Sequence, residues 1–270
     1  MKNKTILITG ATDGIGKQTA IDLAKLEAKI IIHGRDEESC KNTIAKITEE
    51  TGNSDVDFAV ADLSSLTQVN EMAKSITSKY ERLDVLINNA GVYENEKIFT
   101  IDGYENTFAI NHLSHFLLTI KLLDLLKTSS PTRIINVSSI AHSNCDFDID
   151  NLNSEKYFDP YNAYAISKAA NVLFTYKLAE EVKNSGVIVN VLHPGVITTK
   201  LLYKGFSMTG ASLKDGARTS VYLASSKEVE NVSGKYFIDL SERNSASFTY
   251  NTELQEKLWD KSLKMIENYL

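Results

Sequence analysis

The 270-residue chain has few of the residues that hold small secreted proteins together or that form linkers. It contains 2 cysteines, 3 prolines and a single tryptophan. Two thiols in a chain of this length do not form a disulfide framework, so a reducing compartment is expected. Because the sequence has no glycine- and serine-rich stretch and no block of like charges, it contains no visible linker or disordered tail. One large domain is therefore the expected organisation.

The chain also lacks a basic surplus and a long apolar run. Its formal net charge is −6, whereas nucleic-acid binding depends on a basic face, so no nucleic-acid partner is expected. The most apolar segment, 116–126, is interrupted by Lys121 and Asp124 and is shorter than the ~20 residues of a membrane helix. The apolar run Thr5–Thr9 is too short for the core of a signal peptide. We expect a cytoplasmic protein without membrane insertion.

Short β-branched runs alternate with longer, helically periodic segments. Each run has the length and the near-continuous apolar character of a parallel strand buried on both faces. This alternation predicts right-handed βαβ crossovers, with helices on both faces of one sheet. The expected fold is a single doubly wound α/β domain of Rossmann type, residues 1–270, with about seven parallel strands. The expected strands are Thr5–Thr9, Lys29–His33, Asp57–Ala61, Asp84–Asn88, Arg133–Ser138, Val187–His193 and Lys235–Asp239. The expected helices are Gly16–Leu26, Glu37–Glu50, Leu66–Lys79, Tyr104–Leu126, Ala163–Val182, Leu213–Ala224 and Glu253–Ile266.

Glycines mark the first expected strand–helix junction. Gly10 ends the strand where a tight turn is needed, Gly14 lets the backbone approach a pyrophosphate, and Gly16 lets the next helix lie near the sheet. The amino terminus of that helix offers unpaired N–H groups to phosphates. A glycine turn that only opens a helix is the alternative, but the strand–loop–helix context favours a dinucleotide. The cofactor contacts expected here are Gly10, Thr12, Asp13, Gly14, Ile15 and Gly16.

The end of the second strand distinguishes the two nicotinamide cofactors. An acidic residue there would bind the ribose hydroxyls of NAD, but Gly34 occupies that place and Arg35 follows. The guanidinium of Arg35 can bind a 2′-phosphate, so NADP(H) is expected in preference to NAD(H). Asp36 is more simply the cap of the next helix. Asp13, in the glycine loop, is acidic at a place where a second cation would help to bind the 2′-phosphate.

Residues after the third and fourth strands should line the adenosine side of the site. Asp62 could accept a hydrogen bond from the adenine amine, although a helix cap is an almost equally good interpretation. The segment Asn88–Gly91 closes the fourth strand, and ligands of such sheets bind outside the carboxyl ends of the strands. The contacts expected here are Asp62, Leu63, Asn89, Ala90 and Gly91.

A second motif, far along the chain, carries acid–base chemistry. Tyr164 and Lys168 are four residues apart, so both lie on one face of a helix. The ammonium can lower the tyrosine pKa from ~10, which gives a group able to exchange a proton with a carbonyl oxygen. Alone the spacing is a weak signal in a chain with 12 tyrosines, and Tyr93 with Lys97 matches it too. Those two residues stand in a polar stretch without helical pattern, and we interpret them as a chance match.

Two further groups belong near the tyrosine. The fifth strand ends in Ser138 and Ser139, and a hydroxyl there can hold the reacting oxygen against the tyrosine. Asn111 is an awkward residue for a helix interior. It is either a satisfied core amide or the anchor of a water that relays protons to Lys168. No metal is expected, because no set of ligands has metal-binding spacing. Three histidines are more simply structural: His112, His115 and His142.

With these residues in order, the chain resembles the short-chain dehydrogenase/reductase family over nearly its whole length. The motifs that carry the resemblance are Thr9–Gly16, Asn88–Gly91, Asn111, Ser139, Tyr164 with Lys168, and Pro194–Gly195 with Thr199. The resemblance implies hydride transfer to or from a nicotinamide cofactor. It implies that Tyr164 is the general acid/base, Lys168 binds the nicotinamide ribose and lowers the tyrosine pKa, Ser139 orients the substrate, Asn111 supports a proton relay, and Ile197 and Thr199 contact the carboxamide.

Within that family, three segments are similar to the retinol-dehydrogenase-like branch: Asn111–Leu118, Ile135–His142 and Leu258–Trp259. The branch acts mostly with NADP(H) on retinoids, steroids or other apolar aldehydes and ketones. The leading hypothesis is an NADP(H)-dependent enzyme that interconverts an apolar carbonyl compound and its alcohol. An NADP(H)-binding redox sensor with little turnover is the second hypothesis. Epimerase or dehydratase action on a nucleotide sugar is the third, and the residues after Gly195 are too few for it.

The walls of the substrate pocket should come from two segments. One is the long, acidic stretch between Ser139 and Tyr164. The other, 200–210, contains apolar side chains and two glycines, which suits a lid over an apolar substrate as well as an ordinary helix. Its residues are Leu201, Leu202, Tyr203, Gly205, Phe206, Met208 and Gly210. The apolar helices 104–126 and 163–182 are the expected interface of a homo-oligomer. We expect the cofactor half to span about 1–130 and the catalytic and substrate half about 131–270.

Overall fold

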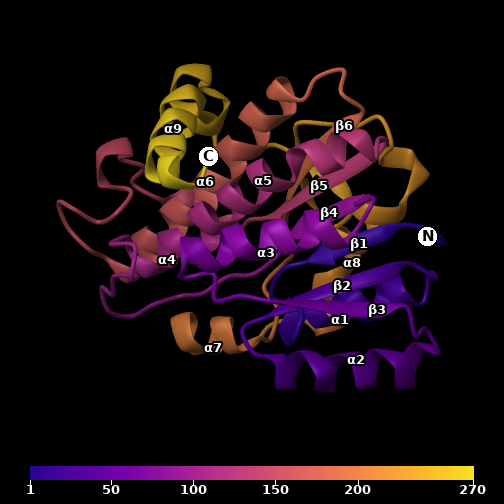
Figure 1. Ribbon diagram of the computed structural model, residues 1–270. Coiled ribbons are helices and arrows are strands. Elements are labelled where there is room, and N and C mark those ends of the chain that lie inside the picture. Colours follow the sequence, from indigo (N-terminus) through magenta and orange to yellow (C-terminus); the bar gives the residue numbers. More distant parts are fainter.

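The computed structural model describes residues 1–270 as one eight-stranded sheet with helices on both faces (Figure 1). The strand order is β3-β2-β1-β4-β5-β6-β7-β8. The chain runs from β1 out to β2 and β3 and then returns to β4 beside β1, so the order reverses between β1 and β4. Ligands of open α/β sheets bind at such a reversal, outside the carboxyl ends of the strands. The strands are β1 Thr5–Ile8, β2 Lys29–Gly34, β3 Val56–Val60, β4 Val85–Asn88, β5 Thr132–Val137, β6 Val187–His193, β7 Lys235–Ile238 and β8 Ser241–Arg243.

The seven predicted strands are confirmed, and they are parallel. The eighth, β8, pairs antiparallel with β7 at the edge of the sheet. Its sequence is Ser-Glu-Arg and all three residues are exposed, so it has none of the apolar character from which a buried strand is predicted.

The helices form one layer on each side of the sheet. Neighbouring strand residues point to opposite faces, so Ile6 and Ile8 pack in one core and Leu7 in the other. The core with Ile6 lies under α1, α2 and α8, and the core with Leu7 lies under α3, α5 and α6. The helices are α1 Gly14–Ala24, α2 Glu37–Thr51, α3 Leu66–Lys79, α4 Asn106–Phe108, α5 Ser114–Thr128, α6 Pro160–Glu181, α7 Lys200–Phe206, α8 Leu213–Ser225 and α9 Thr252–Met265.

Helix starts are gathered at the carboxyl edge of the sheet, because each crossover helix begins after a strand ends there. Their first N–H groups are satisfied by side chains that accept hydrogen bonds. The caps are Asp13 for α1, Asp36 for α2, Ser65 for α3 and Thr199 for α7. This edge therefore combines polar side chains with the amino ends of helices, a combination that suits an anionic ligand.

The helix expected at Tyr104–Leu126 is an unbroken helical run over 106–128, but it is not α-helical throughout. It consists of the short α4, a π-helical turn at Ala109–Leu113, and α5. The π turn contains Asn111, whose side chain bonds to the backbone of Val92 on a neighbouring loop. Hydrogen bonds of this kind are made between segments distant in sequence, so helical periodicity alone did not predict the π turn.

The last helix covers the outer face of α5 and α6, where α9 lies at the upper left of Figure 1. Trp259 packs against Phe116 of α5 and Phe174 of α6, with ring centroids 5.1 and 6.1 Å apart. The expected amphipathic helix at Glu253–Ile266 is confirmed, and it packs on its own domain. The surface that we expected to form an oligomer interface is therefore largely covered within the chain. None of the helices is both long enough and apolar enough to cross a bilayer.

Candidate active site

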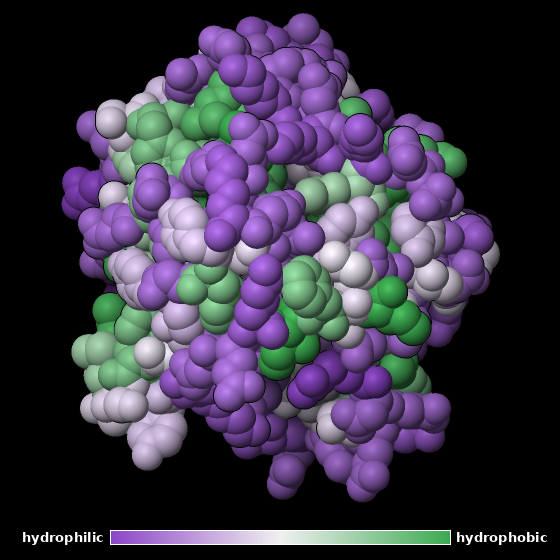
Figure 2. Space-filling view, turned by 90° about the vertical axis from the view of Figure 1, so that its left-hand side faces the viewer, coloured by the Kyte–Doolittle hydropathy of each residue, from purple (hydrophilic) through white to green (hydrophobic).

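One cavity of about 700 Å³ opens at the carboxyl edge of the sheet. Figure 2 shows the left-hand side of the molecule in Figure 1, where apolar side chains form separate patches among hydrophilic ones. Of the predicted catalytic and cofactor-binding residues, Asn111 alone does not line the cavity. The predicted residues that do line it are Gly10, Thr12, Asp13, Gly14, Ile15, Gly16, Arg35, Asp62, Leu63, Asn89, Ala90, Gly91, Ser139, Tyr164, Lys168, Ile197 and Thr199.

The glycine loop fits against its neighbours without spare room. A β-carbon on Gly16 would lie 2.4 Å from both Asn89 Nδ2 and the Gly10 carbonyl oxygen. Gly10 has a φ of +62°, and a β-carbon there would lie 2.9 Å from the Ala90 Cα. The Asn89 amide donates to the Thr9 carbonyl at 2.8 Å, which ties the loop to the end of β4. These close approaches leave an open cradle of backbone at the start of α1, as a dinucleotide pyrophosphate requires.

Gly34 ends β2 beside this loop, and its lack of a side chain has a steric cause. A β-carbon there would lie 2.5 Å from Thr12 Cγ2 and 2.7 Å from Cys40 Sγ. Any side chain at this position would therefore have to displace Thr12 or Cys40. Arg35, the next residue, is exposed at the rim of the cavity and has no carboxylate within ion-pair distance. Its guanidinium is thus available to an anionic ligand.

The two acidic residues with alternative interpretations are both engaged by backbone. Asp36 accepts from Ser39 N at 2.7 Å and caps α2, so the simpler interpretation is confirmed. Asp62 accepts from Ser64 N at 2.9 Å and also lines the cavity. The cap of α3 is Ser65, not Asp62.

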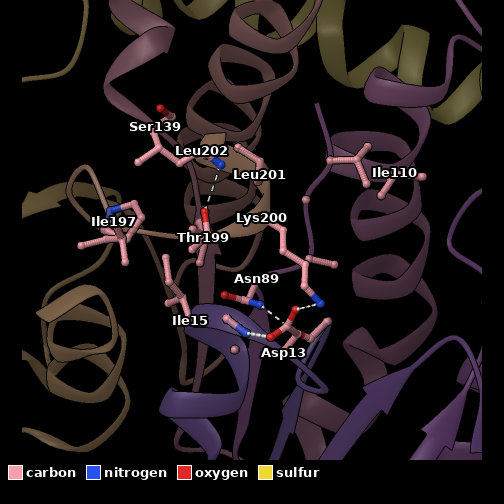
Figure 3. A pocket seen from close by; sticks show the side chains of 18 of the residues that line it. Asp13, Ile15, Asn89, Ile110, Ser139, Ile197, Thr199, Lys200, Leu201 and Leu202 are labelled. Atoms are coloured by element: carbon pink, nitrogen blue, oxygen red, sulfur yellow. Dashed lines mark hydrogen bonds and ion pairs between the residues drawn. The ribbon is translucent and has the colours of Figure 1, made fainter. Parts of the chain in front are cut away.

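A lysine from another part of the chain lies against the glycine loop. Lys200 Nζ of α7 is 2.7 Å from the Asp13 carboxylate (Figure 3). This ion pair, together with the hydrogen bond from Gly14 N, holds the pKa of Asp13 below its ordinary value. The negative charge that the sequence places in the loop is thus balanced by a cation that sequence reasoning missed.

Tyr164 and Lys168 lie on one face of α6, and both are buried, with 6% and 3% of their surface exposed. The Lys168 ammonium is 5.7 Å from the centroid of the Tyr164 ring. Burial raises the pKa of Tyr164 to about 12, and a hydrogen bond with Ser139 offsets part of that rise. Burial lowers the pKa of Lys168 to about 8. The expected lowering of the tyrosine pKa is therefore not found: burial of the phenol is the largest influence on it, and Lys168 is not among the groups that lower it.

The two serines after β5 have different surroundings. Ser138 Oγ is buried and donates to the Lys168 carbonyl at 2.7 Å, which fixes β5 to α6. Ser139 caps a 3₁₀ turn, Ile140–Asn144, by accepting from Ala141 N at 3.2 Å. Since the Ser138 hydroxyl is already bonded to a backbone carbonyl and Ser139 is the less buried of the two, Ser139 is the better placed to reach a ligand.

The Asn111 side chain is fully buried, and its polar atoms are satisfied. Its Oδ1 accepts from Val92 N at 2.8 Å, and its Nδ2 donates to the Val92 carbonyl at 3.0 Å and to Ser167 Oγ at 2.9 Å. Of the two interpretations of Asn111, the side chain fits the satisfied core amide. It fixes the loop after β4 to α6, one residue before Lys168.

The apolar wall of the cavity comes from α7 and from the segment that directly follows it. Leu201, Leu202, Phe206 and Met208 line the cavity, whereas Tyr203 is 72% exposed and does not. The expectation for Tyr203 was therefore wrong. The stretch between Ser139 and Tyr164 contributes apolar and aromatic groups to the lining, and none of its acidic residues. Its lining residues are Ile140, Ala141 and Tyr161.

Tyr93 also belongs to this region, although its pairing with Lys97 is indeed fortuitous: Lys97 Nζ bonds to the Ser154 carbonyl instead. The Tyr93 ring is buried, with its centroid 5.5 Å from that of Tyr164 and 5.3 Å from that of Phe206. Gly205 lies flat on this ring, since a β-carbon there would be 2.9 Å from two ring carbons. Tyr93 therefore joins the acid–base pair to α7.

Other lining residues were not foreseen because no local signal marks them. His33 is one example: its Nδ1 accepts from Gly10 N at 3.1 Å, so Nε2 carries the proton and donates to the Ala61 carbonyl at 3.0 Å. Burial lowers the pKa of His33 to about 4, so the ring is neutral and braces the glycine loop. The lining residues that sequence reasoning missed include His33, Ile110, Ile140, Tyr161, His193, Val196 and Lys200.

A glycine cradle, a free arginine at the rim and a buried Tyr–Lys pair in one cavity define a class of dinucleotide-dependent oxidoreductases. Residues 4–210 match the family model described as short chain dehydrogenase. The chain is 42% identical to mouse retinol dehydrogenase 13 over 97% of its length and 84% of the relative's. It is 40% identical to human polyprenol dehydrogenase over 97% of its length and 85% of the relative's.

Solved structures agree with this result. An uncharacterised protein from Mycobacterium paratuberculosis superposes with a TM-score of 0.83 at 28% identity, covering 98% of this chain and 94% of that one. The Pseudomonas aeruginosa RhlG/NADP active-site complex superposes with a TM-score of 0.73 at 25% identity, covering 88% and 94%. The chain belongs to the short-chain dehydrogenase/reductase family, in the branch of the retinol dehydrogenases. It is an NAD(P)-dependent oxidoreductase that acts on CH–OH groups.

Proposed function

We propose that this enzyme uses NADP(H) in preference to NAD(H) to interconvert an apolar aldehyde or ketone and its alcohol. The observation that carries the cofactor preference is the pair Gly34 and Arg35. Gly34 offers no carboxylate to the ribose hydroxyls, and a side chain there would have to displace Thr12 or Cys40, whereas Arg35 offers an unpaired guanidinium to a 2′-phosphate.

The residues at the cavity fit such a cofactor. The cradle formed by Gly10, Gly14 and Gly16 would hold the pyrophosphate, and Asp62 with Leu63 and the segment Asn89–Gly91 would contact the adenosine side. Ile197 and Thr199, at the start of the α7 segment, would contact the nicotinamide carboxamide. When bound, the dinucleotide supplies or accepts the hydride.

Proton transfer is the task of the Tyr164 hydroxyl. Because burial keeps the tyrosine pKa at about 12, the hydroxyl stays protonated at neutral pH and can donate to the oxygen of a carbonyl that is being reduced. Lys168, charged below its pKa of about 8, stabilises the phenolate that forms and binds the nicotinamide ribose. Ser139 orients the carbonyl oxygen. Asn111 supports the pair by fixing the backbone around Lys168.

The substrate class follows from the wall of the cavity. The lining side chains of α7, which are Leu201, Leu202 and Phe206, suit an apolar compound together with Met208 and Tyr161. The names of the relatives, retinol dehydrogenase and polyprenol dehydrogenase, indicate apolar alcohols for those proteins. We propose that α7 acts as a lid, because it contacts the rest of the site mainly through ion pairs and ring contacts.

Initial rates of NADPH and NADH oxidation over a panel of apolar aldehydes and ketones test this proposal, with wild type and Arg35→Ala. We expect turnover with NADPH, and a loss of about 10- to 100-fold in NADPH kcat/KM in the variant because a charge-assisted contact is removed. NADH rates should not change. Arg218→Ala, which removes a surface arginine paired with Asp239, is the control and should leave both rates unchanged. Equal use of both cofactors by wild type would refute the preference.

Three broader expectations stay predictions. They are the cytoplasmic location, the division of work at about residue 130, and a homo-oligomer. Because α9 packs on α6 and reaches α5 through Trp259, we expect an oligomer to use the part of α5 that stays exposed or another surface. Analytical ultracentrifugation of the purified protein measures its oligomeric state directly.

A further inference from the structure

A buried chain of hydrogen bonds connects α9 to the carbonyls beside the acid–base pair. Ser262 Oγ of α9 is 3.0 Å from His112 Nε2, and His112 Nδ1 is 3.2 Å from Asn171 Oδ1. Asn171 Nδ2 is 2.9 Å from the Asn111 carbonyl oxygen and 3.3 Å from that of Val137. The Ser262, His112 and Asn171 side chains are all buried. The proposed mechanism uses none of these three.

The chemistry of its members gives this chain a single direction. A carbonyl oxygen can only accept, so the atom of Asn171 that faces two carbonyls is the NH2 group and its oxygen faces His112. His112 must then carry its proton on Nδ1 and accept at Nε2, and the Ser262 hydroxyl donates to it. Burial lowers the pKa of His112 to about 4, so the ring is neutral as this arrangement requires.

The chain of hydrogen bonds ends at the Val137 carbonyl, which also binds Lys168. The Lys168 ammonium donates to the Val137 carbonyl at 3.2 Å, and this carbonyl is its one hydrogen-bond acceptor within the protein. The same carbonyl accepts from Asn171, so one residue orients the group that orients the lysine. Val137 is the last residue of β5, and the next residue, Ser138, still donates from its N–H to the Leu192 carbonyl at 2.7 Å, so Asn171 adds a side-chain contact to a peptide that the sheet also holds.

The surroundings of the chain argue against a merely space-filling role. His112 lies among Phe108, Phe116 and Phe174, with ring centroids 5.1, 6.0 and 5.9 Å away. Polar groups are costly to bury in such an aromatic environment, whereas an apolar side chain of similar size would pack there without that cost. A buried chain of hydrogen bonds in which every polar group is satisfied instead fixes the orientation of its side chains.

We propose that Asn171 is a positioning residue for Lys168, and that α9 fixes the orientation of Asn171 through Ser262 and His112. The role of Lys168 in proton transfer rests on the proposed function, but the donor-to-acceptor direction of the hydrogen-bond chain does not. By this inference α9 supports the active site as well as covering α5 and α6.

The kinetic test compares three variants with wild type and with one control variant. Asn171→Leu should lower kcat about tenfold and Ser262→Ala about threefold, because a small displacement of a catalytic group is costly. KM and the NADPH dissociation constant should stay within about twofold, and Ser262→Thr should restore kcat. Ser129→Ala is the control: it removes a buried serine hydroxyl that donates to the Leu125 carbonyl at the carboxyl end of α5. Its kcat should equal that of wild type. If Ser262→Ala keeps the wild-type kcat and pH profile while losing stability as Ser129→Ala does, the proposal is overturned.

A second measurement needs no turnover. Ring ¹⁵N chemical shifts in the labelled protein report the tautomer of His112, and we expect Nδ1–H at neutral pH. Ser262→Ala should shift the Lys168 ¹³Cε resonance, assigned with Lys168→Arg, and Ser129→Ala should not. An Nε2–H tautomer in wild type, or an unmoved lysine resonance in Ser262→Ala, would contradict the inference. A wild type without NADPH turnover would refute the proposed function instead, and this measurement would still decide the inference. The same NMR measurement tests the inference even when the Asn171→Leu variant does not fold.

Discussion

The cofactor groove and the substrate wall of this enzyme are built in different ways. The groove is made of backbone segments at close approach, where a single added carbon on Gly16 would lie 2.4 Å from its neighbours. The wall is made of side chains on α7, held by ring contacts and by the partly exposed ion pair between Lys204 and Glu94. A backbone cradle admits no gradual change, whereas side chains can be exchanged one by one. The construction explains how one family can keep its cofactor class while the substrate varies.

The largest effect is expected where groove and wall meet. Tyr164→Phe removes the hydroxyl that donates the proton and leaves the ring in place, so turnover should fall about 10³-fold or more. The NADPH dissociation constant should change by less than about twofold, since the cradle is untouched. Single-turnover kinetics and fluorescence titration with NADPH measure the two quantities. Turnover like that of wild type would remove Tyr164 from the mechanism.

The next effect breaks the groove alone. Gly16→Ala places a methyl group against Asn89 Nδ2 and the Gly10 carbonyl, so the cradle has to open. We expect NADPH affinity to fall about 100-fold, measured by calorimetric titration. Gly52→Ala is the control, because Gly52 has a φ of +71° with open space around it. It should lower the free energy of unfolding by about 1 kcal/mol and leave affinity unchanged. Equal affinities in the two variants would mean that close approach does not shape the groove.

The third effect concerns charge in the buried pair. Because burial lowers the pKa of Lys168 to about 8, its ammonium is present below that pH and is lost above it. The kcat of carbonyl reduction should be constant below pH 8 and fall about tenfold per pH unit above it. Lys168→Arg should abolish this limb, since an arginine stays protonated. An unchanged limb in that variant would assign it to another group.

The smallest effect is expected at the wall. Gly205→Ala pushes a methyl group into the Tyr93 ring, so α7 has to tilt away from the site. The KM for an apolar substrate should rise about fivefold, with NADPH affinity unchanged and kcat nearly so, as expected for a loss of binding that ground state and transition state share. Tyr203→Ala, on the exposed side of the same helix, is the control. A KM equal to that of wild type in Gly205→Ala would argue against α7 as part of the substrate site.

Sequence reasoning succeeded where the chemistry is local. The strand–helix alternation gave the seven parallel strands, and the glycine spacing and the Tyr-x-x-x-Lys pair pointed to residues that share one cavity. It failed where a property depends on neighbours from elsewhere in the chain. The Tyr93–Lys97 match is a chance one as predicted, but nothing in the sequence indicated that Tyr93 packs on Tyr164. The pKa of Tyr164 was expected to fall, yet burial raises it.

The sequence by itself determined the family, the fold and the backbone cradle, because glycines, strand periodicity and helical spacing act over a few residues. The tertiary structure decided the rest. It alone brought Lys200 to Asp13, closed α7 over the Tyr93 ring, and joined α9 to the carbonyls around Lys168. Such contacts join segments that are far apart along the chain. They depend on how the layers pack, and no local pattern of residues records that packing.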